Sequence, residues 1–227
     1  MNKYVLSLIV SLMLFSAAGA QSFSGILGAT DPALAAAVRT ALEKNLPATP
    51  APSPVNKVKT ANGPEYYAPL QRGAIYDYEY TSSEFAGVKI LRLEFDAFSA
   101  KDSSVTVTKS VFSSNTRQTA TFSIYLTNNG IQADGSPLAG PRLEMPSQVR
   151  YNQTWSEGQN QSRVAAVNTQ IKTSAGDYTG CVRIITRIGG NGGTINRYYA
   201  PGVGLVAEQM LTKEKYEAIS LVAYQLK

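Results

Sequence analysis

From about residue 66 onward, apolar and polar residues alternate with a period of two, the pattern of strands that bury one face. In the first run, Tyr76, Tyr78 and Tyr80 share one face, while Asp77 and Glu79 take the other. Similar runs lie near residues 90–97, 105–108, 120–127, 150–156, 163–173, 181–188, 194–200, 205–211 and 216–226. Residues typical of turns separate the runs, and no helical pattern of useful length interrupts them. The pattern therefore predicts a chain of successive strands.

Short connections predict antiparallel neighbours, because parallel strands need crossovers of a dozen or more residues. About ten strands with one apolar side each must fold around a single core, as a barrel, a half-barrel or a sandwich. We expect a mainly β protein with a single curved antiparallel sheet, shaped as a half-barrel or open barrel.

The N-terminal region has a different composition. Residues 1–20 combine Lys3, an apolar run and small residues before Gln21, which predicts a cleavable secretory signal peptide. The apolar run is shorter than the roughly 20 residues that a membrane-spanning helix needs. We therefore expect an exported protein, periplasmic or extracellular in a bacterium, and not an integral membrane protein.

Three further segments follow the predicted signal peptide. In residues 21–46, Asp31 and Pro32 are typical of a helix start, and an apolar residue recurs every fourth position after them, predicting a short amphipathic helix over 32–45. Residues 47–65 are rich in Pro, which favours an extended linker. The antiparallel β domain is then expected over 66–227.

Composition excludes several kinds of chemistry. The chain has no His and one Cys, so it cannot build a Ser-His-Asp triad, a Cys-His pair, a His-rich metal site or an internal disulfide. We expect no cofactor and no metal. The net charge of +5 falls to +4 if Lys3 leaves with the signal peptide, and the basic residues are scattered, so a nucleic-acid partner is not expected.

Four landmarks occur in order along the predicted domain. They are residues 68–73 before Tyr76, residues 143–146, residues 173–178 before Cys181, and the run Arg-Tyr-Tyr-Ala-Pro-Gly-Val-Gly-Leu-Val over 197–206. On these landmarks the sequence resembles a family of exported bacterial β domains of unknown function, similar in style to the half-barrels of bacterial lipoprotein carriers. The third landmark departs from that family, which more often has Gly, then Thr or Ser, then Phe. The resemblance implies a single-sheet β domain and no known reaction.

The last landmark also supplies the candidate site residues. Tyr198 and Tyr199 should point to opposite faces of their strand, one inward and the other outward. They are candidates for contacting a ligand at the rim of the sheet. The alternative is a structural corner, in which Pro201, Gly202 and Gly204 bend the chain where a side chain would clash or force the wrong φ.

Two other features of the sequence suggest chemistry, namely the single Cys and a pair of carboxylates. Cys181 begins a strand and could be a reactive thiol or pair with a partner's Cys, although a buried, inert thiol is the simpler interpretation. Glu94 and Asp96 share a strand face at about 7 Å, a spacing that an inverting glycosidase could use. A solvated polar face with Arg92 explains the same pair.

These observations favour a non-catalytic exported protein that binds or carries an envelope protein, a lipid or a glycan at the concave face or rim of its sheet. A structural or assembly partner that uses an exposed sheet edge is the alternative. A large apolar cavity would favour the carrier, whereas a filled core with an unpaired, uncharged edge strand would favour the assembly partner. A hydrolase that uses Glu94 and Asp96 is the third hypothesis.

Overall fold

A computed structural model describes residues 63–226 apart from 69, 100, 102, 114, 115 and 191. The predicted signal peptide, the helix expected over 32–45 and nearly all of the predicted linker lie outside the described residues. The described chain forms one short 3-10 helix, η1 (Pro64–Tyr66), and then only strands. These strands are β1 (Ile75–Ser82), β2 (Lys89–Ser99), β3 (Ser104–Phe112), β4 (Arg117–Thr127), β5 (Gly130–Ala133), β6 (Arg142–Pro146), β7 (Thr154–Glu157), β8 (Asn160–Thr173), β9 (Gly176–Ile188), β10 (Gly193–Ala200), β11 (Gly204–Leu211) and β12 (Tyr216–Gln225).

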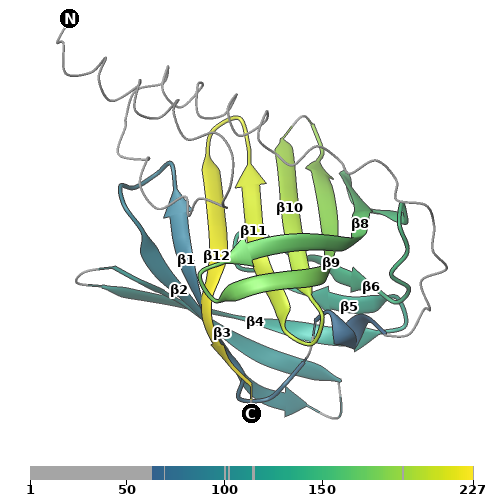
Figure 1. The fold of residues 1–227 in the computed structure, drawn as a ribbon, viewed down its shortest axis with the longest axis horizontal. Coiled ribbons are helices and arrows are strands. Elements are labelled where there is room, and N and C mark those ends of the chain that lie inside the picture. Colours follow the sequence, from purple (N-terminus) through teal and green to yellow (C-terminus); the bar gives the residue numbers. More distant parts are fainter. Residues whose placement is uncertain are drawn as a thin grey trace, which may run out of the picture.

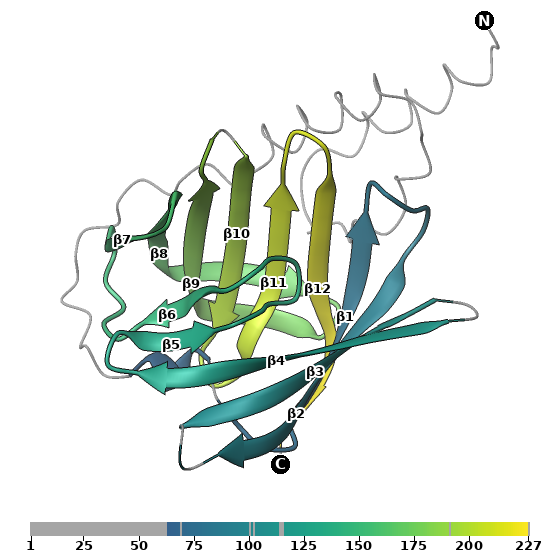
Figure 2. The same cartoon turned by 180° about the vertical axis from the view of Figure 1, so that it is seen from behind.

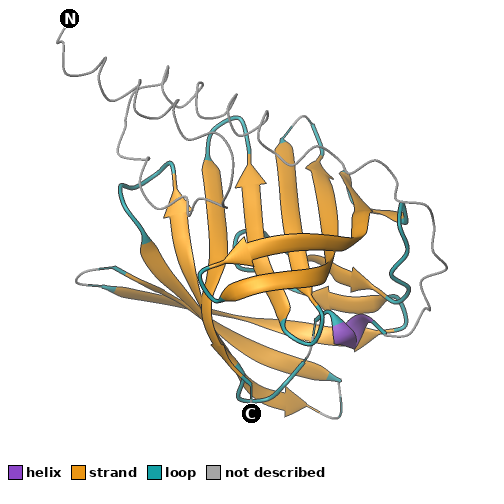
Figure 3. Ribbon diagram, in the orientation of Figure 1, coloured by secondary structure: helices purple, strands orange, loops and turns teal. Residues whose placement is uncertain are grey.

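All of these strands belong to one sheet, in the order β6-β5-β4-β3-β2-β1-β12-β11-β10-β9-β8-β7. Every pairing is antiparallel, and strands adjacent in the sequence are adjacent in the sheet apart from β6 and β7, which lie at its two ends. The β1–β12 pair joins the two meanders. The sheet curls into an almost closed barrel (Figure 1), and its strands dominate the described chain (Figure 3). The predicted single curved antiparallel sheet is confirmed.

The barrel stays unclosed between its two end strands, β6 and β7. Side chains join this seam in place of a backbone ladder. The backbone N–H of Leu143 in β6 donates to the Glu157 carboxylate in β7 at 2.7 Å, and the Leu143 carbonyl accepts from Arg197 at 3.1 Å. The exposed edge that usually invites another strand is thus already occupied at this point of β6.

The interior of the barrel is filled mainly by apolar and aromatic side chains. Tyr76, Tyr78 and Leu91 are almost fully buried on the neighbouring strands β1 and β2, whereas Asp77 lies on the outer side and pairs with Arg92 at 2.7 Å. Burial of a large apolar side chain contributes roughly 1.5–3 kcal/mol. The alternation that predicts the strands therefore also decides which face turns inward.

A long hairpin formed by β8 and β9 folds back over the outside of the barrel. It crosses β10–β12 on the side away from β4–β6, as the two opposite views show (Figure 1, Figure 2). Register shifts along β8, such as that between Thr169 and Ile171, let the hairpin bend. The Ala175 N–H at its tip donates to the Leu221 carbonyl in β12 at 3.1 Å. This hairpin buries part of the outer face of the sheet.

The strand boundaries differ from the predicted runs in several places. β5 and β6 are not among the predicted strands, because β5 has only four residues and β6 alternates Arg142 and Glu144 where apolar residues are expected. The strand expected near 150–156 is shortened to 154–157, and β9 begins at Gly176 where the pattern indicated residue 181.

Candidate ligand site on the concave face

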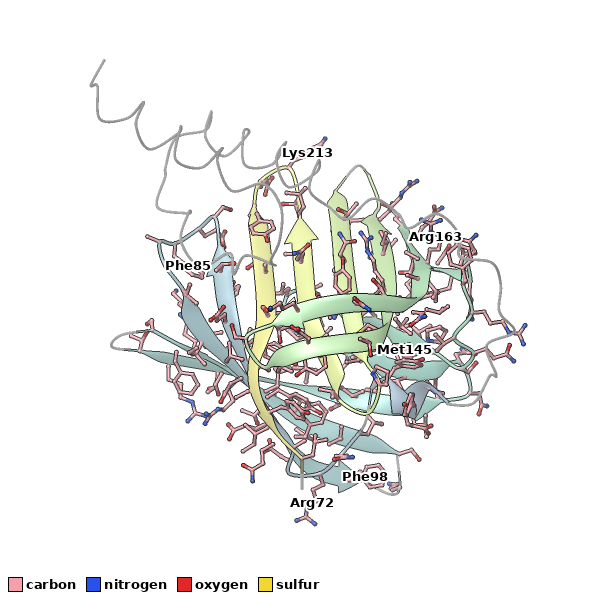
Figure 4. The ribbon with its side chains drawn as sticks, viewed as in Figure 1. Arg72, Phe85, Phe98, Met145, Arg163 and Lys213 are labelled. Carbon is pink, nitrogen blue, oxygen red and sulfur yellow. The ribbon has the colours of Figure 1, made fainter. Side chains whose placement is uncertain are left out.

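A groove of about 530 Å³ opens on the concave face of the first meander. It lies at the end of the barrel that carries Phe85, away from the end with Arg72 and Phe98 (Figure 4). A volume of this size falls within the roughly 300–1,000 Å³ typical of small-molecule pockets. Its walls are Tyr80, Glu84, Phe85, Lys89, Lys109, Val111, Gln118, Thr119 and Ala120.

The strand register brings most of these side chains to one face. Lys89 pairs with Tyr80, and Lys109 pairs with Ala120 across the next ladder. Lys109 also pairs with Leu93, which lies deeper in the barrel. Directly paired residues of antiparallel strands share a face, so the groove continues the inner surface of the barrel.

Deeper along the same strands lies a second, smaller cavity of about 50 Å³. Its lining is apolar and aromatic apart from the Glu144 carboxylate and the tyrosines. The hydroxyls of Tyr76 and Tyr78 donate to backbone carbonyls at 2.8 Å each. The full lining is Ala68, Leu70, Tyr76, Tyr78, Leu93, Phe95, Phe122, Ile124, Ile131, Pro137, Glu144, Tyr199, Gly204 and Leu205. The interior is largely filled, which is the opposite of the large cavity that a carrier was expected to show.

The loop between β5 and β6, residues 134–141, contributes to the cavity and contacts the groove. Pro137 lines the cavity and is buried, and Leu138 packs against the core. Lys109, in the wall of the groove, donates from Nζ to the Pro137 carbonyl at 3.2 Å. Inside the loop, the Ser136 hydroxyl donates to the Ala139 carbonyl at 2.7 Å. The loop thus forms part of the cavity wall and is hydrogen-bonded to Lys109 of the groove.

Lys109 is a half-buried cation that faces the interior. Burial lowers the pKa of its ammonium group, and the carboxylates of Glu217 and Glu208 act against that effect from a distance. Among the residues that the structure describes, no carboxylate lies within salt-bridge distance of Lys109 Nζ. Glu217 is instead held by Lys215 at 3.0 Å and by the Tyr80 hydroxyl at 2.5 Å. The ammonium group of Lys109 is therefore available to donate a hydrogen bond to an anionic group of a ligand.

Four buried charges form a network in the barrel wall behind the cavity. Arg142 donates to Glu144 at 2.7 Å and to Glu208 at 2.5 and 2.8 Å. Arg197 lies 3.4 Å from Glu144, which also accepts a hydrogen bond from the Tyr199 hydroxyl. Two guanidinium groups thus compensate two carboxylates, which is the condition under which charges are tolerated inside a protein.

The environment of this network shifts the ionisation of its members. Burial alone would raise the pKa of the Glu144 carboxyl, but Arg142 and Arg197 outweigh it, and the pKa is lowered. Burial and the neighbouring Glu144 raise the pKa of Tyr199, so its hydroxyl stays protonated and donates. The group is a hydrogen-bonded network in which the guanidinium groups and the Tyr199 hydroxyl donate to the two carboxylates.

Tyr198 and Tyr199 have separate surroundings. Tyr199 points into the barrel, where it lines the cavity. Tyr198 lies on the opposite face, but only 6 % of it is exposed, because Cys181 and the β8–β9 hairpin cover it. The two tyrosines thus lie on opposite faces of β10, and the hairpin shields the outward-facing ring of Tyr198 from solvent. Sequence periodicity cannot show a hairpin folded over the outer face.

Pro201, Gly202 and Gly204 form the turn between β10 and β11. Gly202 has a φ of +69° and Gly204 a φ of +110°, a region that other residues rarely adopt. The Gly202 N–H donates to the Tyr66 carbonyl in η1 at 2.7 Å, so the turn holds the start of the domain. Gly204 lines the inner cavity, whereas none of the three residues lines the groove.

Cys181 is completely buried, and burial raises the pKa of its thiol to about 11. Little reactive thiolate is therefore present near neutral pH.

Glu94 and Asp96 line neither the groove nor the cavity. Glu94 lies 3.5 Å from Arg117, and Asp96 accepts a hydrogen bond from Thr108 at 2.6 Å. The two carboxylates thus belong to the polar outer face.

Sequence reasoning missed the residues that give the site its charge, namely Lys109, Arg142, Glu144, Arg197 and Glu208. A signal exists for some of them, because Arg197 and Glu208 interrupt apolar runs at inward-facing positions.

In the described part of the chain, no cluster of residues is suited to hold a metal ion. No helix among the described residues has the length and apolar character needed to cross a membrane.

No protein-family model and no curated protein matches the sequence. One structural match is described as a "putative lipoprotein" from Parabacteroides distasonis ATCC 8503, with 15% identity over 70% of this chain and 98% of the other, and a TM-score of 0.45. Another is described as a "putative exported protein with YmcC-like fold" from Bacteroides fragilis NCTC 9343, with 12% identity over 70% of this chain and 99% of the other, and a TM-score of 0.48.

Proposed function

We propose that this protein is a non-catalytic, exported protein of the bacterial cell envelope that binds a ligand on the concave face of its sheet. The ligand-sized groove beside Lys109 is the observation that carries the proposal. Its walls combine apolar surface from Phe85 and Val111 with a few polar groups, the usual composition of a binding pocket. The export of the protein rests on the predicted signal peptide at residues 1–20.

The test is to block the groove without disturbing the fold. Ala120 is exposed on the concave face, and its neighbour Thr121 is exposed on the other face of the same strand. The full chain is purified from a bacterial envelope fraction as wild type, Ala120→Trp and Thr121→Trp, and co-purifying molecules are identified by mass spectrometry. We expect one class of molecule on the wild type and Thr121→Trp, and its loss from Ala120→Trp. Equal retention by all three proteins would refute the groove as the site.

A second function is favoured by one specific feature of β4. Its residues 117–121 are exposed on both faces and pair with β3 only, since the ladder to β5 covers 124–127. This stretch has a single charged residue, Arg117. Together with the largely filled interior, it meets the description of an edge that could add a strand from another envelope protein.

Charges placed along an edge oppose strand addition. For this second function, Thr119→Lys combined with Thr121→Lys should abolish cross-linking of the full chain to its partner in an envelope fraction. Thr106→Lys, on the neighbouring interior strand, serves as the control and should leave cross-linking unchanged. Partner capture that survives the double substitution would exclude this edge.

A further inference from the structure

The concave face changes from polar and charged in the groove to apolar in the inner cavity. Lys109 in the groove pairs with Leu93, which lines the inner cavity. Ala120 in the groove lies two residues before Phe122, which also lines the cavity. The same strand faces therefore run from a wet, charged mouth to an apolar interior. A ligand lying along them meets charge first and hydrocarbon-like surface afterwards.

The charge at the mouth is positive. Lys89 and Lys109 line the groove, and its only carboxylate, Glu84, lies 3.9 Å from Lys215. Lys89 Nζ sits 4.0 Å from the centre of the Phe85 ring, which leaves its ammonium group in contact with the groove. An anionic group would gain a charge-assisted hydrogen bond at Lys109, whereas a cationic one would be repelled. The more distant Glu217 and Glu208 are each already bound to a cation.

The loop over residues 134–141 contacts both the charged and the apolar part of this surface. Its Pro137 carbonyl takes the hydrogen bond of Lys109, while Pro137 and Leu138 fill the apolar space behind it. A molecule with an acceptor group on a hydrocarbon chain could replace both contacts at once.

We propose that the ligand of this site is a single-chain amphiphile with an anionic head group, held by Lys109 at its head and by the interior under loop 134–141 along its chain. This inference rests on the proposed function and specifies its ligand. Lys109 serves as the head-group residue, and Lys89 adds to the positive potential at the mouth. The interior supplies affinity for the chain through burial of apolar surface.

The test compares three probes of equal chain length, namely dodecanoate, dodecanol and dodecyltrimethylammonium. Each is titrated below its micelle concentration into the purified full chain by calorimetry, with wild type, Lys109→Met and Lys109→Arg. Lys101→Met is the matched control, because Lys101 is exposed in the β2–β3 turn and outside the groove. The unfolding midpoint of each variant is recorded so that loss of fold is recognised.

We expect saturable one-to-one binding of dodecanoate to the wild type and to Lys101→Met. Loss of one charge-assisted hydrogen bond should weaken dodecanoate binding to Lys109→Met by about tenfold or more, and Lys109→Arg should restore most of it. Dodecanol should bind more weakly than dodecanoate and be insensitive to Lys109→Met. If Lys109→Met fails to fold, Lys109→Gln takes its place with the same expectation.

The outcomes separate this inference from the proposed function. Equal binding of dodecanoate and dodecanol, with no effect of Lys109→Met, would overturn the head-group assignment and leave a concave-face binding site. Preference for dodecyltrimethylammonium would overturn the anionic class. Binding of none of the three probes, together with a groove that retains no envelope molecule, would overturn both.

Discussion

Arg142 in β6 donates two hydrogen bonds to Glu208 in β11, although 66 residues separate them in the chain. β6 ends one meander and β11 lies within the other, so the pair spans the interior of the barrel. Both side chains are almost completely buried. The pair therefore ties together two halves of the sheet that share a backbone ladder only at β1 and β12.

Removal of one partner of this pair should be strongly destabilising, because the other charge is left buried and unpaired. We expect Glu208→Leu or Arg142→Met to lower the free energy of unfolding by about 3–5 kcal/mol each. The double variant should lose much less than the sum, since the remaining Glu144 and Arg197 still compensate each other. Urea denaturation of the four proteins measures the coupling. Additive losses would show that the two side chains do not interact.

Tyr199 and Tyr198 offer a matched comparison between adjacent residues. Tyr199→Phe removes the hydroxyl that donates to the buried Glu144 carboxylate and should cost about 1–3 kcal/mol. Tyr198→Phe removes a hydroxyl for which the described residues show no hydrogen bond, and should change stability by less than about 0.5 kcal/mol. Equal effects in thermal or urea unfolding would contradict the different surroundings of the two rings.

The lowered pKa of Glu144 predicts a stability loss in acid. Because the folded-state pKa lies below the ordinary value of 4.5, the unfolded state binds more protons between the two values, and stability rises with pH there. The contribution of Glu144 should be fully present above about pH 5 and be lost as pH falls toward the folded-state pKa. Urea midpoints measured across this range should fall less steeply in Glu144→Gln. An unchanged slope would show that Glu144 is not stabilised in its ionised form.

Substitution of Gly202 tests whether the backbone of the β10–β11 turn disfavours a residue other than Gly. A Cβ at this position would meet no atom within 4 Å, so Gly202→Ala should cost about 1 kcal/mol or more through its φ of +69° alone. Gly140 is the control, since its Cβ would also meet open space and its φ is not positive. Gly140→Ala should be neutral or slightly stabilising. The unfolding midpoints of the two variants decide between a strained turn and an unstrained one.

The period-two pattern was sufficient to predict the fold class, because each strand buries one face and hairpin turns exclude parallel crossovers. It did not predict β6, because Arg142 and Glu144 occupy inward positions where an alternating strand usually places apolar residues. Their burial is possible only because Glu208 and Arg197 arrive from distant strands. Such pairing is a property of the closed barrel and not of any local stretch of sequence.

The candidate site was predictable only in part. Tyr199 was selected from its strand and does reach the inner cavity, but it lies at the deep end. Lys109 is not among the predicted site residues, because a Lys in a strand normally points to solvent, although it occupies the same strand face as Val105, Val107 and Val111. The loop over 134–141 was predicted only as a connection. Its contact with the site depends on the Pro137 carbonyl, which accepts a hydrogen bond from Lys109 only in the tertiary fold.

The most direct measurement of the central claim is the backbone amide NMR spectrum of the full chain during titration with dodecanoate. We predict saturable shifts at Lys109, Val111 and Ala120 and throughout loop 134–141, with little change at Thr106 or Asp96 on the outer face. Saturable shifts confined to the outer face, or no saturable shifts on the concave face, would contradict the claim that this surface is the binding site.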